Sequence, residues 1–384
     1  MSQKQILIVA GEASADRYGA RLVSRLNAMH GPEALCFYGT GGDEMQKAGV
    51  HLQCHIRDLA HIGVREALSG LQTYYKIFQR LVKESARRRP DLAVLLDFPE
   101  FNLRLAKRMK RMGIKVVYYI SPQIWAWRSG RIQLIRKYVD KMLVILPFEE
   151  DYYRNRGVDA EFVGHPILED FCPDSNREEF LNSLGLDPWR RTVAILPGSR
   201  RKEIDHILPT LLHASLQLLK ELPAQFLISA APTVEFSHID GIVKDLLPED
   251  LRSKHFRLLP RASRDILANS DFAFVKSGTS SLEAALVGIP FLITYKISPL
   301  SWWIGSMLIR TPMKGLVNLI AHEKIVPELY QDEATPQALA QVAREYLMSP
   351  EKSTAMCVRL VEIRDRLSVR RASETAAAMV SRYL

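Results

Sequence analysis

Short, continuous apolar runs alternate with longer amphipathic segments along most of this chain. The short runs predict strands that are buried on both faces, and the segments between them have the spacing of amphipathic helices. Strands that alternate with helices in this way are typical of parallel sheets covered on both sides. The expected strands are residues 5–10, 35–38, 91–96, 114–120, 141–146, 161–163, 192–196, 225–229, 256–258, 272–275 and 291–294.

The pattern breaks once and then restarts. Gly164-His165-Pro166 interrupts it, and the polar run from Cys172 to Asn176 is typical of a linker followed by a helix cap. A length of 384 residues also suits two domains better than one. We therefore expect an α/β protein with two doubly wound, Rossmann-like lobes that face each other across a cleft. The expected lobes are residues 1–168 and 169–364, with a terminal helix at about 365–384 able to pack back on the first.

Composition narrows the class of protein. A hydrophobic fraction of 47% and a charged fraction of 25% are ordinary for a folded, soluble chain. The sequence holds no run of eighteen apolar residues, so it predicts no membrane-spanning helix. A strand is expected almost at the start of the chain, which leaves no room for a signal peptide. These observations predict a cytoplasmic protein.

The net charge of +9 is unevenly distributed. Residues 101–140 hold ten Lys and Arg residues against one acidic residue, Asp140. Such a patch favours an anionic partner, either nucleic acid or the surface of a membrane. A solvated basic face is an equally good interpretation. Because the sequence shows no zinc-finger, RNP or heptad pattern, we expect no nucleic-acid partner.

Residues 274–290, FVKSGTSSLEAALVGIP, carry the most informative pattern. An apolar strand runs into the turn Ser277-Gly278-Thr279, and a helix-forming run follows. Gly278 permits close approach of a ligand to the backbone, and the first amides of the helix form a site for an anion such as a diphosphate. Glu283, about one turn further, is placed to accept hydrogen bonds from ribose. An ordinary capped helix is the alternative interpretation.

A second strand-turn-helix unit lies about eighty residues earlier. Residues 192–201 read TVAILPGSRR, in which Gly198 and Ser199 form the turn and Arg200 is suited to pair with phosphate oxygens. Two such units in one half-chain predict a nucleoside diphosphate site at the carboxyl ends of parallel strands. Neither turn matches a P-loop. Residues 39–42, GTGG, lack the third glycine of a dinucleotide fingerprint, and we interpret them as a turn.

Three N-terminal motifs add a family resemblance. They are VAGEASAD at 9–16, LDFPEFNL at 96–103 and YISPQIWAWR at 119–128. Together with LPGSR and SGTSSLEAALVGIP, in this order, they resemble the lipid-A-disaccharide synthases, which are glycosyltransferases of the GT-B type. The resemblance implies transfer of 2,3-diacylglucosamine from UDP to 2,3-diacylglucosamine 1-phosphate, giving a β-1′,6-linked disaccharide phosphate and UDP. Ala15 replaces the glycine usual in the first motif, which predicts a locally reshaped loop.

An inverting sugar transfer needs a base beside the acceptor hydroxyl. Asp97 follows an apolar strand, and the resemblance supports it as the catalytic acid or base. Pro99 predicts an extended exit from that strand, which would hold the carboxylate at the edge of the sheet. Capping of the helix that starts near Glu100 is the alternative role for Asp97. Glu12 is the second candidate base, and Ser14, in the same motif, is expected on the acceptor side.

In the second lobe, Asn318 and Gln331 match a family motif and are expected to contribute to the UDP-sugar site. Capping of a helix is the alternative role for Asn318. The chain contains no Asp-x-Asp motif, the arrangement with which metal-dependent glycosyltransferases hold a diphosphate-bound ion. With Arg200 and helix amides available for the leaving UDP, we expect neither a metal nor any other cofactor.

Residues 66–81 place Leu68, Leu71, Tyr75 and Phe78 at helical spacing. A core-facing stripe is the default interpretation, and a surface for the acyl chains of the substrates is the functional one. The pair Trp302-Trp303 raises the same question, because paired tryptophans suit a membrane interface. These features predict peripheral association with the cytoplasmic face of the inner membrane. A homodimer is possible.

Two alternatives stay open at this point. One is another UDP-sugar enzyme of the same architecture, such as a muramyl-type transferase or an epimerase, although the SPQIWAWR segment argues against both. The other is a non-catalytic, nucleotide-regulated protein of the membrane surface, which would use the basic patch and bind UDP without turnover.

Overall fold

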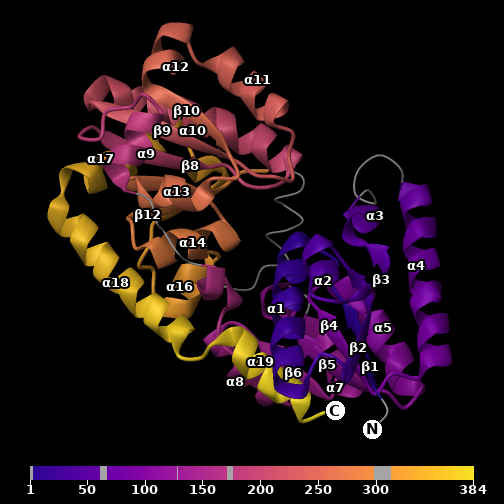
Figure 1. Ribbon diagram of the computed structural model, residues 1–384. Coiled ribbons are helices and arrows are strands. Elements are labelled where there is room, and N and C mark those ends of the chain that lie inside the picture. Colours follow the sequence, from indigo (N-terminus) through magenta and orange to yellow (C-terminus); the bar gives the residue numbers. More distant parts are fainter. Residues whose placement is uncertain (1–2, 61–66, 128, 171–175, 298–312) are drawn as a thin grey trace. The chain divides into compact units, whose positions relative to one another are not determined.

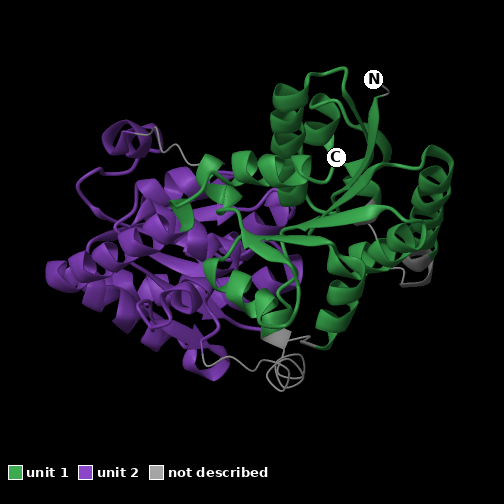
Figure 2. Ribbon diagram, turned by 90° about the horizontal axis from the view of Figure 1, so that it is seen from below, with its two compact units in different colours: residues 1–170, 367–384 green, residues 171–366 purple. Residues whose placement is uncertain are grey.

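The computed structural model describes residues 3–60, 67–127, 129–170, 176–297 and 313–384. The chain divides into two compact units (Figure 2). Unit 1 contains residues 1–170 and also the terminal segment 367–384, and unit 2 contains residues 171–366. Helix α18 (Pro350–Ser368) leads from unit 2 into the terminal segment of unit 1.

Unit 1 is built on a parallel sheet that has seven strands in the described residues, in the order β3-β2-β1-β4-β5-β6-β7 (Figure 1). Its strands are β1 Lys4–Val9, β2 Leu35–Gly41, β3 His51–His55, β4 Leu92–Leu96, β5 Lys115–Tyr119, β6 Lys141–Val144 and β7 Ala160–Phe162. Its helices are α1 Ala13–His30, α2 Asp43–Lys47, α3 Ile56–Ala60, α4 Ala67–Arg88, α5 Pro99–Arg111, α6 Ile124–Trp127, α7 Ile132–Tyr138, α8 Pro147–Arg154 and α19 Ala372–Ser381, with short 3₁₀ turns η2 Ser129–Arg131 and η3 Pro166–Asp170.

Unit 2 repeats the plan with a six-stranded parallel sheet over its described residues, in the order β10-β9-β8-β11-β12-β13. Its strands are β8 Arg191–Leu196, β9 Ala224–Ala230, β10 Phe256–Pro260, β11 Phe272–Lys276, β12 Phe291–Tyr295 and β13 Glu328–Tyr330. Its helices are α9 Arg177–Ser183, α10 Arg201–Glu221, α11 Phe236–Leu246, α12 Glu249–His255, α13 Ser263–Ala268, α14 Thr279–Val287, α16 Leu316–Ala321 and α17 Pro336–Met348, with the 3₁₀ turn η4 Gln331–Glu333.

Both units thus have the doubly wound, Rossmann-like topology, which confirms the predicted fold class. Each expected strand is present, with ends that differ by up to three residues. The sequence pattern missed β3 and β13, which are edge strands of the two sheets. In each unit the strand order reverses beside the first strand, between β1 and β4 and between β8 and β11. Ligands of doubly wound folds bind at such reversal points.

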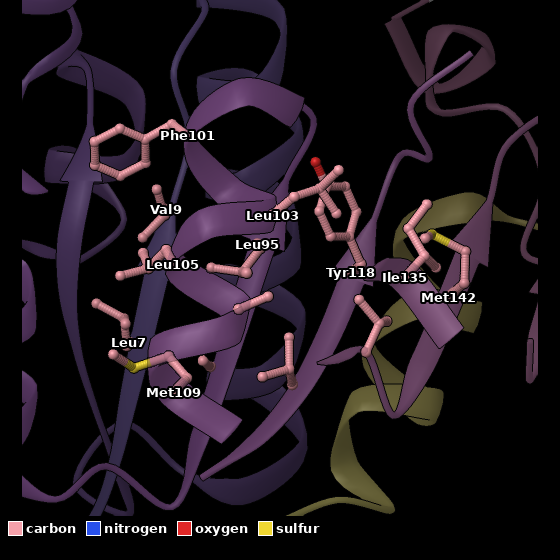
Figure 3. Close-up of a cluster of buried hydrophobic side chains, with 14 of the residues drawn as sticks. Leu7, Val9, Leu95, Phe101, Leu103, Leu105, Met109, Tyr118, Ile135 and Met142 are labelled. Atoms are coloured by element: carbon pink, nitrogen blue, oxygen red, sulfur yellow. The ribbon is translucent and has the colours of Figure 1, made fainter. Parts of the chain in front are cut away.

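Both faces of the unit 1 sheet are buried. Leu7, Val9 and Leu95 point into a cluster with residues of α4, α5 and α7 (Figure 3). The alternate residues Ile6 and Ile8 enter a second cluster beneath α1 and α19. Alternation of neighbouring residues between two apolar cores explains why these strands are continuously apolar in sequence. Within the described residues, none of the helices combines the length and apolar character needed to cross a membrane.

Residues 39–42 differ from the predicted turn. The first three continue β2 as far as Gly41, and the pairing of β2 with β3 shifts register between Gly39 and Thr40. Gly39 has a φ of +152°, and a Cβ at this position would lie 1.8 Å from the carbonyl oxygen of Ile8. The glycine is therefore required by a close approach of two backbones. Gly42 then precedes α2, where its amide donates to the buried carboxylate of Asp16 at 2.6 Å.

We predict that Gly39→Ala lowers the free energy of unfolding by about 3 kcal/mol or more, since the new methyl group meets backbone and φ is restricted to glycine. Urea unfolding followed by circular dichroism measures the effect. Gly49→Ala is the matched control, because Gly49 has a φ of +99° with no atom within 4 Å of the added Cβ. This control should cost only about 1–2 kcal/mol. Equal midpoints for the two variants would contradict the close-approach argument.

Candidate active site

The carboxylate of Asp97 lies at the reversal point of the unit 1 sheet. Asp97 directly follows β4, and Glu12 precedes α1 just after the neighbouring strand β1. Glu12 is exposed, whereas the side chain of Asp97 is largely shielded from solvent. The first motif and the LDFPEFNL motif are therefore brought to one edge of one sheet.

The backbone at Asp97 is held in a conformation that non-glycine residues rarely adopt. Asp97 and Phe98 have φ values of +47° and +49°, both in the left-handed region. The hydroxyl of Tyr118 donates to the carbonyl oxygen of Asp97 at 2.5 Å, and Nδ2 of Asn102 donates to the same oxygen at 2.8 Å. The amide of Asp97 donates to the carbonyl of Tyr119 at 3.1 Å. Main-chain contacts therefore fix the residue and leave its carboxyl group for chemistry.

One expectation about this turn is wrong, and the alternative role of Asp97 is not found either. Pro99 does not impose an extended exit, because the hydrogen bonds to Asp97 and the packing of Phe98 outweigh the local preference of a residue before proline. Asp97 also does not cap the helix. The N-cap of α5 is Phe98, and no side chain caps it.

Burial and, to a smaller extent, the charge of Glu12 together raise the pKa of the Asp97 carboxyl from 3.8 to about 6. A hydrogen bond from the amide of Phe98 opposes the shift. A carboxyl group with a pKa near 6 is ionised at neutral pH and is still basic enough to accept a proton efficiently. Asp97 thus has the position and the acidity of a general base.

Aromatic side chains support the strained turn. A Cβ on Gly11 would lie 2.4 Å from the ring of Phe98, so this glycine lets the ring lie against the end of β1. The ring of Phe98 stacks on Phe101 at 5.3 Å, and Tyr74 and Phe78 of α4 contact Phe101 edge-on at 5.0 and 5.6 Å.

The predicted lipid-binding stripe on α4 divides between two environments. Phe78 packs on the core, as in the default interpretation, whereas Tyr75 is 61% exposed. The side chains of Leu68 and Leu71 lie outside the described part of the structure, as do Trp302 and Trp303.

The SPQIWAWR segment follows β5, the strand next to β4. Ile120, the residue just before the segment, has a left-handed backbone with a φ of +67°. Ser121 and Trp125 both donate to the buried carboxylate of Glu149, at 2.7 and 3.0 Å. Tyr153 donates to the carbonyl of Pro122 at 2.9 Å. Burial raises the pKa of Glu149 to about 7, although Trp125 and Ser121 oppose the shift. Glu149 and Tyr153 of α8 therefore anchor this loop, which follows the strand beside β4 and Asp97.

The remaining positions of the first motif lie in α1. Ser14 is half-buried in the first turn of this helix, and Ala15 follows it. The prediction that Ala15 reshapes the loop is wrong, because the residue is helical and buried and has no positive φ. Asp16 is structural, since its carboxylate also accepts from the amides of Glu44 and Met45 at 3.1 Å.

In unit 2, the first predicted turn joins β8 to α10. Gly198 has a φ of +113°, and Arg200 is the N-cap residue of the helix. Ser199 is exposed, and its carbonyl accepts from Thr233 at 2.6 Å. The guanidinium of Arg200 is 74% exposed and lies 3.2 Å from a carboxylate oxygen of Glu203.

The second predicted turn joins the neighbouring strand β11 to α14. Gly278 is the N-cap residue with a φ of +142°, and the helix begins at Thr279. Ser277 donates its amide to the carbonyl of Thr294 on β12 at 2.9 Å. Glu283 is mostly buried, and its carboxylate lies 3.9 Å from Nε of Arg264. The structure thus brings two helix N-termini together at the reversal point of the unit 2 sheet, where amides favour anions.

Sequence reasoning missed two charged residues between these turns. Lys276 is the last residue of β11, and its Nζ lies 3.0 Å from the buried carboxylate of Glu203 in the first turn of α10. The available signal was a lysine that closes an otherwise apolar strand, FAFVK, directly before the Ser-Gly-Thr turn.

The side chain of Asn318 has a structural role and is not available to bind a ligand. Its side chain is fully buried. Its Nδ2 donates to Val326 at 2.8 Å and to Glu328 at 2.7 Å, and its Oδ1 accepts the amides of Ile325 and Val326 at 2.9 Å. An asparagine side chain has two donor hydrogens and two acceptor sites, so none remains for a ligand. It does not cap a helix either, since it lies within α16.

Gln331 follows β13 and has a φ of +51°. Its Oε1 accepts the amide of Ile297 at 2.8 Å, and its Nε2 donates to the carbonyl of the same residue at 3.0 Å. This reciprocal pair fixes the backbone just beyond β12. The side chain is buried and acts on the strand end in this structure.

A hollow lies elsewhere in unit 1, between α1, η3 and the start of α19. Its arginines face carboxylates: Arg21 lies 3.7 Å from Glu169, and Arg25 lies 3.3 Å from Glu374. Arg370 and Arg371 line the hollow too, and each lies within 3.3 Å of a carboxylate oxygen. Across the described ranges, no group of three His, Cys, Asp or Glu side chains is placed to hold a metal ion.

Solved structures resemble the whole chain in fold. The UDP-GlcNAc 2-epimerase of Neisseria meningitidis, bound to UDP-GlcNAc, matches with a TM-score of 0.65 at 12% identity over 98% of each chain. MurG from Acinetobacter baumannii matches with a TM-score of 0.60 at 14% identity, over 99% of this chain and 100% of that chain. At these identities the likeness shows the fold, which is that of the GT-B proteins.

Sequence comparison is more specific. The family described as lipid-A-disaccharide synthetase matches residues 6–380. The lipid-A-disaccharide synthase of Syntrophus aciditrophicus is 42% identical over 99% of this chain and 97% of its own length. The enzyme of the same name from Koribacter versatilis is 40% identical over 98% and 97%. The chain therefore belongs to the lipid-A-disaccharide synthase family, a family of lipid A glycosyltransferases.

Proposed function

We propose that the protein transfers 2,3-diacylglucosamine from UDP to 2,3-diacylglucosamine 1-phosphate with inversion at the anomeric carbon. The products are a β-1′,6-linked disaccharide 1-phosphate and UDP. Membership of the family supports the lipid A glycosyltransferase role. The observation that carries the specific reaction is the carboxylate of Asp97, fixed by its main chain at a sheet reversal point and shifted to a pKa of about 6.

In this proposal, Asp97 accepts the proton of the acceptor hydroxyl as that oxygen attacks the anomeric carbon. Inversion needs a base on the acceptor side only, and one carboxylate suffices. Glu12, which is close enough to influence the pKa of Asp97, is the second candidate. Ser14, in the same turn, would contact the acceptor.

Unit 2 would hold the UDP-sugar. The N-termini of α10 and α14 lie on adjacent strands, and their dipoles and free amides favour the diphosphate. Gly198, Ser199, Ser277, Gly278 and Thr279 would supply the backbone approach. Arg200 would pair with a phosphate, and Glu283 would accept from ribose. The structural roles of Asn318 and Gln331 make them organisers of the surrounding loops in this proposal.

Both proposed substrates carry acyl chains, so the enzyme must meet a bilayer. Helices α4 and α5 pack on the same face of the unit 1 sheet. Each shows cations one turn apart on its exposed side: Lys76, Arg80 and Lys83 on α4, and Arg104, Arg108 and Arg111 on α5. We call these six residues the basic face. Together with exposed Tyr75, this face suits reversible docking on the anionic, cytoplasmic surface of the inner membrane.

We predict that Asp97→Asn lowers kcat/KM about 10²- to 10⁴-fold while folding and UDP binding are retained, since the main-chain hydrogen bonds remain. Release of UDP from UDP-2,3-diacylglucosamine with the monophosphate acceptor measures the rate. The wild-type rate should rise with pH through about 6, because burial raises the carboxyl pKa to that value and only the ionised form accepts a proton. The rate of the variant should not show this rise through about pH 6. Near-normal activity of Asp97→Asn would move the role to Glu12.

We predict that Arg200→Ala and Glu283→Ala each weaken UDP binding about ten- to a hundredfold, because each removes a hydrogen bond to a charged group. Isothermal titration calorimetry measures the affinity. Lys220→Ala, an exposed lysine in the last turn of α10, serves as the control that should bind normally. The proposed nucleotide site is refuted by unchanged affinity in both test variants.

We predict that the protein co-sediments with phosphatidylglycerol vesicles at low salt and is released at high salt, as screened charges require. Replacing Arg104, Arg108 and Arg111 together by Gln should weaken docking about a hundredfold, at about 1 kcal/mol for each residue. Neutral phosphatidylcholine vesicles are the control. If wild-type protein ignores anionic vesicles at low salt, the basic face is only solvated surface.

A further inference from the structure

Lys276 occupies an unusual place between the two glycine turns of unit 2. Strands β8 and β11 are neighbours, with Leu196 paired to Val275, so the turns that follow them lie side by side. A Cβ on Gly198 would lie 3.3 Å from Cδ of Lys276, and a Cβ on Gly278 would lie 3.7 Å from its Nζ. The aliphatic part of the lysine side chain thus lies against Gly198, and its ammonium group lies near Gly278. Only 15% of this side chain is exposed.

Glu203 holds the ammonium in place. Its Oε2 lies 3.0 Å from Nζ of Lys276, and its Oε1 accepts from Arg200 at 3.2 Å and from the hydroxyl of Tyr295 at 3.3 Å. The ammonium also lies 5.0 Å from the centre of the Tyr295 ring. Glu203 is itself buried. Four side chains from β11, β12 and the start of α10 therefore form one charged cluster.

The charges of this cluster do not balance. Two cations share the single carboxylate of Glu203, and the positive ends of α10 and α14 open at the same edge of the sheet. Burial lowers the pKa of Lys276, while the carboxylate of Glu203 raises it and the charge of Arg200 lowers it. An anion that entered between the glycines would restore the balance, and a diphosphate has the charge and length to meet both turns.

We propose that Lys276 is a further catalytic residue, whose ammonium contacts the diphosphate of UDP and stabilises the charge of the leaving group. This inference rests on the glycosyl transfer proposed above. In that step the bond between the anomeric carbon and the β-phosphate oxygen breaks, and its electron pair stays on that oxygen. The acceptor oxygen forms the new bond to the anomeric carbon, and its proton passes to the base.

Burial distinguishes Lys276 from Arg200. The exposed guanidinium of Arg200 can attract UDP from solution, but water weakens its field. The ammonium of Lys276 is shielded and already oriented by Glu203, so it need not reorganise as charge develops on the phosphate. Lys276 is therefore the cation whose contribution should appear mainly in kcat.

The test compares Lys276→Met with the double variant Lys276→Met/Glu203→Gln. The double variant removes the carboxylate that the single change would leave without its lysine, so it protects the test against a folding failure. UDP affinity is measured by calorimetry, uridine affinity by ligand-observed NMR, and turnover by UDP release. Lys220→Met, at the far end of α10, is the matched control.

Both variants should bind UDP about ten- to a hundredfold more weakly and turn over about 10²- to 10³-fold more slowly, while uridine, which lacks phosphate, should bind as in the wild type. Lys276→Arg should recover part of the rate. Equal weakening of UDP and uridine would show a structural role and overturn the inference, as would unchanged UDP affinity and kcat. In the latter case the proposed transfer stands, whereas a wild-type protein that neither binds UDP nor releases it overturns both.

Discussion

Each unit is built around a parallel sheet that is buried on both faces, and this constraint decides where chemistry can occur. Covered faces leave only the strand ends accessible, and in a parallel sheet all carboxyl ends lie at one edge, where helix N-termini also open. Unit 1 places Asp97 at this edge, directly after β4, and unit 2 places Lys276 there, at the end of β11. Each of these strands pairs with the first strand of its unit. The two candidate sites therefore occupy equivalent positions of the same topology, with a carboxylate in unit 1 and an ammonium group in unit 2.

Several residues with a strained backbone lie at the carboxyl edge of the unit 1 sheet. Asp97, Phe98 and Ile120 follow adjacent strands and all have left-handed φ values. Such conformations cost about 1–3 kcal/mol each and persist only where surrounding contacts impose them. Here the contacts are visible: Tyr118 and Asn102 hold the first turn, and Glu149 anchors the loop after the second. The rigid setting explains how a carboxylate at a chain turn keeps one orientation.

The sequence predicted what the buried, central elements determine. Continuous apolar strands and the glycine turns beside them were visible because burial on both faces leaves no room for polar residues. Strand β3 escaped because its sequence, HLQCH, is mostly polar, and β13 escaped because it is only three residues long, so neither contains an apolar run. The conformation of Phe98 and the full hydrogen bonding of Asn318 depend on partners distant in space, which local preferences do not reveal. Lys276 escaped because its buried, oriented position depends on the ion pair with Glu203, which is distant in sequence.

Unit 1 is discontinuous in sequence, which has a consequence for synthesis on the ribosome. Helix α19 covers apolar residues of α1 and the sheet with Ala376, Ala377 and Val380. All of unit 2 is translated between the first part of unit 1 and this helix. At an elongation rate of about 5–20 residues per second, those residues take roughly 10–40 s to synthesise. During this interval the apolar residues that α19 later covers are exposed on the nascent unit 1. They need protection from non-specific contacts until α19 has left the exit tunnel.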